Sequence, residues 1–134
     1  MKLIVCIDKF NGTMFNKRRQ SRDANLIDDL IELIGSSELY ISNYSKPLFE
    51  KYNSAQIIDD PSSILKKDAY YFLEGNTDDI PLNYIDELVI YKWNRHYPAD
   101  VHFNIDLSLF KLDSVFDFEG SSHKKITREV YKRK

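Results

Sequence analysis

The chain has 134 residues, of which 43% are hydrophobic and 30% charged, and its formal net charge is −2. This length favours one domain, residues 1–134, around a single core, and a near-neutral charge excludes a general attraction of the whole surface to nucleic acid or anionic lipid. The lone cysteine, Cys6, cannot form an intramolecular disulfide, and the apolar run around it is too short for a signal peptide or a membrane span, so we expect a cytoplasmic protein with no membrane partner.

The first half of the chain alternates strands with helices. A Val- and Ile-rich run predicts a buried strand over residues 2–8, followed by a turn at Asn11 and Gly12. A helix is expected next, with Ser21 or Asp23 as its cap and Gly35 at its end. Its apolar residues recur at helical spacing: Leu26, Ile27, Leu30, Ile31 and Ile34.

Further elements continue the alternation up to residue 75. Three strands are predicted over residues 38–42, 55–59 and 69–75. Short helices between them are opened by Ser45 with Pro47, and by Asp60 with Pro61 in the segment DPSSILKK. This order is typical of a parallel sheet with crossover helices.

After residue 80 the pattern predicts strands over 86–93, 100–107 and 124–133, which would add antiparallel strands at one edge. The expected fold is therefore α/β: one three-layer domain with a mixed, mainly parallel sheet and antiparallel C-terminal strands.

A basic segment separates the first strand from the first helix. Lys17, Arg18, Arg19 and Arg22 fall within six residues, and such a run is either a solvated loop that pairs with nearby acids or an anion site. Four cations so close together repel one another unless a nearby negative charge compensates them. A phosphate at the N-terminus of the following helix would compensate their charge. We therefore expect the four side chains to face a cleft.

Two other polar positions are candidate ligand contacts. Asn43, Tyr44 and Ser45 follow a predicted strand, and ligands bind at the carboxyl ends of strands in open α/β sheets; an ordinary capped turn is the alternative. His123 in GSSHKK is either a phosphate contact or acid, or simply an exposed loop residue. The three histidines and one cysteine form no metal set, so no metal is expected.

The layout resembles dihydrofolate reductase over nearly the whole chain. LIVCIDKFNG is similar to that family's first strand and loop, RRQSRDANLIDDL to the loop and helix that carry its active-site carboxylate, and ADVHFNIDLSLFKLDSVFDFE with ITREVYKR to its last strands. The resemblance implies a dihydrofolate reductase-like fold. It also implies that Asp23 is the catalytic acid, with a pKa raised in a partly buried pocket; a plain helix N-cap is the alternative.

The cofactor half departs from the family pattern. Where the family grips a phosphate, this chain has SNYSK, and its paired glycines become LEGN with a carboxylate at Glu74. A carboxylate repels a pyrophosphate, so NADPH is possible but not supported.

The chain also resembles small bacterial proteins that share FNKRRQSRD, YKWNRHYPAD and GSSHKKIT and carry the label ribonuclease Z. That activity needs a His-x-His-x-Asp-His cluster for two metals, which His96, His102 and His123 do not form, so the label is rejected.

Two functions follow. The first is a small-molecule binding protein, or a divergent reductase, that takes an anionic, nucleotide-like or pterin-like ligand. Its expected ligand contacts are Phe15, Asn16, Lys17, Arg18, Arg19, Arg22, Ile27, Asn43, Tyr44, Ser45 and His123. The alternative is a non-catalytic module that uses the basic segment 17–22 to bind RNA or a protein. The sequence leaves the oligomeric state open.

Overall fold

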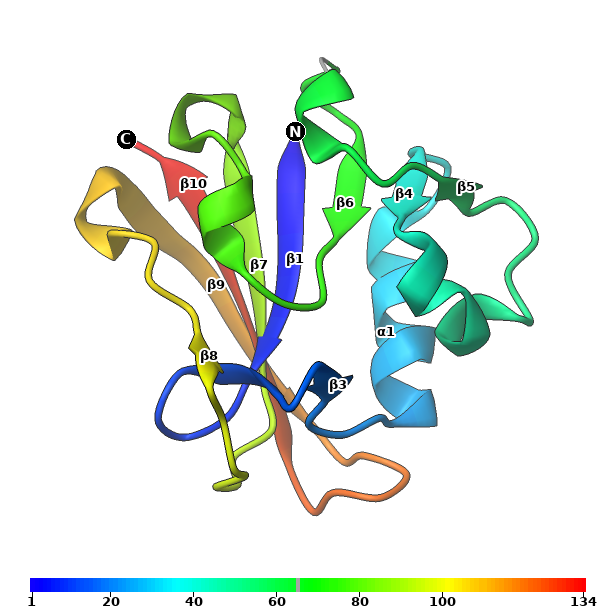
Figure 1. Ribbon diagram of the computed structural model, residues 1–134, viewed down its shortest axis with the longest axis vertical. Helices are drawn as coiled ribbons and strands as arrows, with labels where there is room; N and C mark the ends of the chain where they lie inside the picture. Colours follow the sequence, from blue (N-terminus) through cyan, green and yellow to red (C-terminus); the bar gives the residue numbers. More distant parts are fainter. Residues whose placement is uncertain (65) are drawn as a thin grey trace.

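A seven-stranded sheet forms the centre of the protein in the computed structural model, which describes residues 1–64 and 66–134 (Figure 1). In sheet order its strands are β5 (Gln56–Ile57), β4 (Leu39–Ile41), β6 (Tyr70–Phe72), β1 (Lys2–Ile7), β7 (Glu87–Lys92), β10 (Ile126–Arg133) and β9 (Phe110–Phe118). Pairing is parallel from β5 to β7 and antiparallel for β10 and β9. The predicted mixed, mainly parallel sheet is confirmed.

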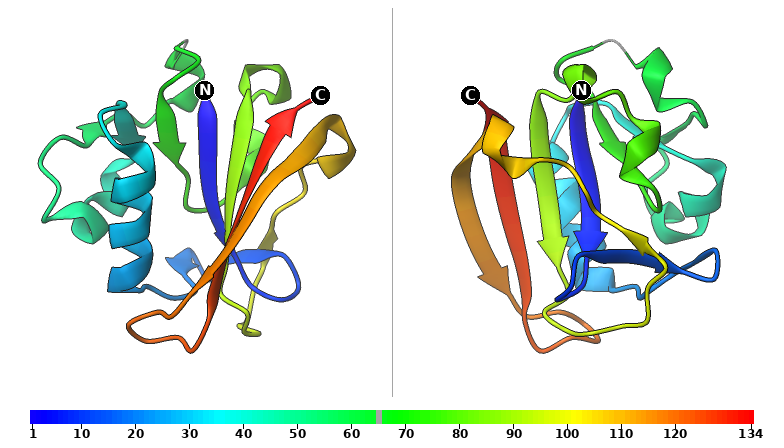
Figure 2. Two further views of the ribbon diagram at one scale, coloured as in Figure 1. Left: turned by 180° about the vertical axis from the view of Figure 1, so that it is seen from behind. Right: turned by 60° about the vertical axis from the view of Figure 1, so that its left-hand side comes forward.

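One α-helix covers one face of this sheet. Helix α1 (Ala24–Ile34) begins after Asp23, whose side chain accepts the backbone N–H groups of Asn25 and Leu26, as an N-cap residue does. It ends at Gly35, which has a φ of 58° and donates its N–H to Ile31, a conformation that glycine adopts without strain. The helix lies against the sheet (Figure 2), and its buried residues share one core cluster with Ile4 of β1 and with Val89 and Tyr91 of β7. The predicted helix is confirmed.

Short 3-10 turns replace the other expected helices. The helix opened by Ser45 is the 3-10 helix η1 (Asn43–Phe49), and the one capped by Asp60 is η2 (Pro61–Ser63), while Leu65 of that predicted segment lies outside the described residues. On the face opposite α1, a second core cluster brings Ile64, Ile80 and Ile85 against Leu3 and Leu88. Loops with the turns η2, η3 (Thr77–Asp79) and η4 (Leu82–Tyr84) thus supply the third layer.

The basic segment is not a simple loop. Residues Gly12–Phe15 form β2 and Arg18–Arg19 form β3. With β8 (Val101–His102) they make a small sheet of order β3-β2-β8, which the sequence did not predict. The tight turn between β2 and β3 places Asn16 and Lys17 at positive φ. This hairpin lies at the carboxyl end of β1, beside the first turn of α1 (Figure 1).

The strand expected over 100–107 was wrong in extent and place. Only Val101–His102 form a strand, β8, and it pairs with β2 instead of the main sheet. Asp106 caps the 3-10 turn η5 (Leu107–Leu109), and the buried Phe103 packs in the second core cluster. The alternating apolar residues Phe103, Ile105 and Leu107 therefore belong to an irregular segment that packs on the second core cluster. The edge strand of the main sheet on this side is β9.

Candidate functional site

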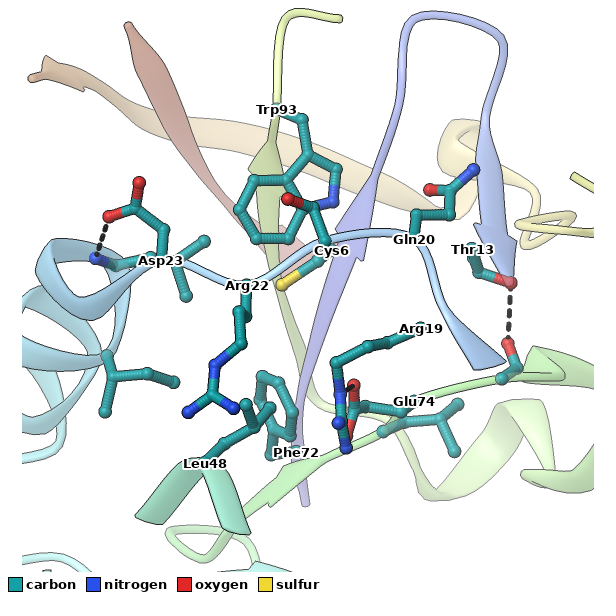
Figure 3. A pocket seen from close by; sticks show the side chains of 15 residues that line it. Cys6, Thr13, Arg19, Gln20, Arg22, Asp23, Leu48, Phe72, Glu74 and Trp93 are labelled. Carbon is teal, nitrogen blue, oxygen red and sulfur yellow. Dashed lines mark hydrogen bonds and ion pairs between the residues drawn. The ribbon is translucent and has the colours of Figure 1, made fainter. Parts of the chain in front are cut away.

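A pocket lies where the carboxyl ends of β1, β6 and β7 meet the start of α1 (Figure 3). Its floor is apolar and includes Cys6 from β1, Phe72 from β6 and Trp93 after β7. Helix α1 contributes Leu26 and Ile27. This is the end of the sheet at which open α/β proteins bind ligands.

The rim of the pocket is polar. It is formed by Thr13, Arg19, Gln20, Ser21, Arg22, Asp23 and Glu74. Past Arg22 the pocket continues into a wider groove between α1 and η1. The pocket and the groove share Arg22, Ile27 and Leu48 in their linings. The site is therefore a narrow apolar cleft joined to a broader groove, with a guanidinium at the junction.

Arg19 is neutralised inside the rim. Its Nε lies 2.7 Å from one Glu74 carboxylate oxygen, and its Nη2 lies 3.0 Å from the other. The guanidinium also packs on the Tyr44 ring, 4.5 Å from the centroid, and Ser45 donates its hydroxyl to Glu74 at 2.8 Å. Tyr44 and Ser45, which the sequence suggested as ligand contacts, lie beside Arg19, and the contacts they make hold the Arg19–Glu74 pair in place.

Arg22 differs from the other cations of the segment. Figure 3 shows its side chain pointing into the pocket beside Leu48. Among the side chains that the structure describes, no carboxylate forms an ion pair with Arg22, Arg18 or Lys17. Arg22 is therefore the cation available to a ligand in the pocket.

The expectation that all four cations face a cleft was wrong for Lys17 and Arg18. Both are exposed in the β2–β3 hairpin and do not line the pocket, because the tight turn carries them outward. Phe15 and Asn16 also lie in this hairpin, outside the pocket lining. Of the contacts predicted in this segment, Arg19 and Arg22 line the pocket, whereas Phe15, Asn16, Lys17 and Arg18 lie outside it.

Asn43 lies outside the pocket lining as well. It is exposed, and its backbone N–H donates to Asp59 at 3.0 Å. This contact ties the start of η1 to Asp59, 16 residues further along the chain, and the N-cap residue Ser42 makes no side-chain cap of its own.

The Asp23 carboxylate is buried and fully engaged in hydrogen bonds. Besides capping α1, it accepts the backbone N–H groups of Ser121 and Ser122, each at 2.9 Å, and it lies 2.9 Å from Nδ1 of His123. Gly120 is required for this wrapping, since a Cβ there would lie 2.5 Å from the carboxylate.

The expected raised pKa of Asp23 is wrong. Burial opposes ionisation of the carboxylate, but the hydrogen bonds from His123, Ser122, Ser121 and Leu26 outweigh it and lower the pKa of Asp23 below its ordinary value. Asp23 is thus ionised near neutral pH, which does not suit the general acid implied by the resemblance.

His123 is not the exposed loop residue that its sequence context favoured. It is 5% exposed, stacks on Trp93 with ring centroids 4.7 Å apart, and does not line the pocket directly. Its Nε2 lies 2.8 Å from the Tyr97 hydroxyl and 3.1 Å from the Ser21 hydroxyl. The sequence carried no local signal for this contact, because His123 and Asp23 are 100 residues apart in the chain.

The residues present do not fit a dinucleotide pyrophosphate. At the carboxyl end of β6 the Glu74 side chain is only 9% exposed and is held by Arg19 and Ser45. The backbone beside it is also in use, because Thr13 donates its hydroxyl to the carbonyl of Gly75 at 3.0 Å. Because Glu74 already balances the charge of Arg19, this point offers a pyrophosphate no free positive charge, so we assign no NADPH chemistry to this site.

Within residues 1–64 and 66–134, no group of three or more His, Cys, Asp or Glu side chains is arranged to hold a metal ion. No helix in the same residues is long and apolar enough to cross a membrane.

Comparisons with known proteins agree with this architecture. No family model matches the chain, and no curated protein sequence matches it. A solved structure of the dihydrofolate reductase from Enterococcus faecalis, complexed with NADP(H) and RAB-propyl, is similar with a TM-score of 0.71. The match covers 98% of this chain and 95% of that chain, with 12% sequence identity. The chain therefore has a dihydrofolate reductase-like fold.

Proposed function

We propose that the protein binds a small ligand that combines a flat apolar group with an anionic group. The observation that carries this proposal is the Arg22 guanidinium, which points into an apolar pocket without a carboxylate partner among the described side chains. Arg22 is itself exposed, so the argument rests on its position: a guanidinium at the edge of an apolar cleft can pair with the anionic end of a ligand through charge-assisted hydrogen bonds.

The shape of the site supports one orientation of the ligand. The cleft floor of Phe72, Trp93 and Leu26 suits a flat ring, while the anionic group would lie at Arg22, where the cleft joins the groove along α1. Nucleotide-like and pterin-like compounds with a carboxylate or phosphate have this form. The pterin-specific contact of a free acid is not part of the proposal, because Asp23 is occupied by Ser121, Ser122 and His123.

A ligand titration with a matched pair of variants tests the proposal. Folate and AMP are titrated by calorimetry, and thermal shift confirms each binding event, since ligand at 100 times Kd stabilises the fold by about 2.7 kcal/mol. Arg22→Gln removes the inner cation and is expected to weaken binding by about 1.5 to 3 kcal/mol, roughly 10- to 150-fold. Arg18→Gln removes an exposed cation from the same segment and should leave Kd within about twofold.

Equal loss in both variants would show that the ligand responds only to the general charge of the segment. Absence of binding for both compounds, in a protein that unfolds cooperatively, would remove the support for these ligand classes.

A second function is favoured by the outer surface of the hairpin. Lys17 and Arg18 are exposed there, and Phe15 in the same hairpin is 47% exposed. Cations beside an exposed aromatic ring suit single-stranded RNA, which stacks its bases on such rings. Lys17→Gln with Arg18→Gln should then weaken binding of a single-stranded RNA oligonucleotide and reduce its salt dependence. Unchanged affinity would exclude this surface.

A further inference from the structure

Four side chains beside the pocket form a continuous hydrogen-bonded series. The Asp23 carboxylate lies 2.9 Å from Nδ1 of His123. On the other side of the ring, Nε2 lies 3.1 Å from the Ser21 hydroxyl and 2.8 Å from the Tyr97 hydroxyl. Carboxylate, imidazole and hydroxyl therefore follow one another in the order used to activate a hydroxyl nucleophile.

The imidazole is held in one orientation. The side chains of His123 and Asp23 are 2% and 0% exposed, so neither exchanges this contact for water. Two backbone N–H groups, from Ser121 and Ser122, fix the carboxylate, and the ring of Trp93 stacks on the imidazole with an interplanar angle of 27°. Because a carboxylate only accepts, Nδ1 carries a proton, and in the neutral imidazole Nε2 then presents its lone pair to the two hydroxyls.

Ser21 is the hydroxyl that can meet a ligand. It lines the pocket, whereas Tyr97 does not. Ser21 also directly precedes Arg22, the cation that points into the same pocket. A ligand whose anionic group binds Arg22 would therefore have its neighbouring atoms within the region that Ser21 lines.

We propose that Ser21 is a nucleophile, with His123 as its general base and Asp23 as the residue that positions the imidazole. The substrate class is a small ester that also carries an anionic group. This inference rests on the proposed function, because the same pocket would bind the substrate.

The step balances with water as the only co-reactant. Ser21 Oγ bonds to the ester carbonyl carbon while its proton passes to Nε2 of His123. The carbon–oxygen bond to the alcohol breaks, and the departing alkoxide takes that proton from His123. A water molecule then attacks the acyl-serine with proton transfer through His123, which releases the acid and restores the Ser21 hydroxyl.

Tyr97 gives the proposal a distinctive consequence. Its hydroxyl is closer to Nε2 than that of Ser21, and the two hydroxyls are 3.5 Å apart. They compete for one lone pair, so Tyr97 lowers the share of molecules in which Ser21 donates to His123. Tyr97→Phe should therefore accelerate attack by Ser21, whereas a purely structural hydrogen-bond network would be weakened without any gain in reactivity.

Covalent labelling with diisopropyl fluorophosphate, a small uncharged reagent for activated serines, tests the assignment. Intact-mass spectrometry measures the labelling rate, and peptide mapping locates the adduct. We expect one adduct on Ser21, loss of labelling in Ser21→Ala, and a decrease of at least about 100-fold in His123→Gln. Ser54→Ala, at an exposed serine away from the pocket, is the matched control and should label at the wild-type rate.

Folding of each variant is checked by circular dichroism and thermal unfolding, and mapping of the wild-type adduct decides the question even if a variant is unstable. No adduct on the folded wild type beyond that of the urea-unfolded chain, or an adduct elsewhere than Ser21, would overturn the proposal. Because the reagent is uncharged, this result is independent of anion binding at Arg22. Ligand binding without labelling would support the proposed function and refute the assignment of Ser21 as a nucleophile. Labelling without ligand binding would support the nucleophile and refute the proposed ligand.

Discussion

The substitution Asp23→Asn tests the role that the structure gives to the buried Asp23 carboxylate. In the folded chain one Asp23 oxygen accepts N–H groups of Asn25, Leu26 and Ser121, and the other accepts from Ser122 and lies against His123. Asp23→Asn can keep the helix cap with its remaining oxygen, but its NH2 group then faces the donors of Ser122 and His123.

The cost follows from those donors. A buried donor left without an acceptor costs about 1 to 3 kcal/mol, and His123 can recover one contact by moving its proton to Nε2. We therefore expect Asp23→Asn to lower the free energy of unfolding at pH 7 by about 2 to 4 kcal/mol. Urea unfolding followed by fluorescence of the single tryptophan, Trp93, measures this directly, because its ring stacks on His123.

Asp28→Asn is the matched control. Asp28 lies exposed on the same helix, and its change should stay within about 0.5 kcal/mol. A loss below about 1 kcal/mol for Asp23→Asn, with an unchanged m value, would refute the view that this carboxylate joins α1 to the loop around residues 120–123.

The stabilisation should also depend on pH. Because the pKa of Asp23 is lowered in the folded chain from its ordinary value of 3.8, the unfolded chain binds more protons in this range, and stability falls as the pH falls. The difference between wild type and Asp23→Asn should be fully present above the ordinary value and shrink as the pH drops below it. An unchanged difference at pH 3 would contradict the lowered pKa.

Three further predictions concern other parts of the fold. Leu30→Ala, at a fully buried position of α1, should cost about 2 to 5 kcal/mol in urea unfolding. Tyr91→Phe removes a 2.6 Å hydrogen bond to Asp29 and should cost about 1.5 to 3 kcal/mol in the same assay, since the acceptor is charged; a neutral change would show that the hydroxyl contributes nothing. Burial, followed by the charge of Glu74, raises the pKa of the Cys6 thiol, so iodoacetamide at pH 8 should modify Cys6 much more slowly in folded than in urea-unfolded protein; equal rates would show that the thiol is open to solvent.

Local patterns predicted much of the fold. Helix α1 follows from the spacing of Leu26, Leu30 and Ile34 between a good N-cap residue and Gly35, because helical periodicity and caps are properties of neighbouring residues. The parallel order of β1, β4 and β6 follows from apolar runs separated by helical turns. The carboxyl end of these strands was likewise a predictable place for a ligand pocket.

Tertiary contacts decided the rest. The β2–β3 hairpin is short, and its strands are stabilised by pairing with β8, almost 90 residues away, so nothing in residues 12–19 alone distinguishes it from a loop. That hairpin turns Arg18 outward while Arg22 points into the pocket. From its neighbours in the sequence, Asp23 could be a helix cap or an acid. The chain after β9 brings His123 to the Asp23 carboxylate, and hydrogen bonds from His123 and Ser122 lower the pKa of Asp23. The sequence thus specified the elements through local spacing, while the chemistry of the site depended on side chains that meet only after the sheet has assembled.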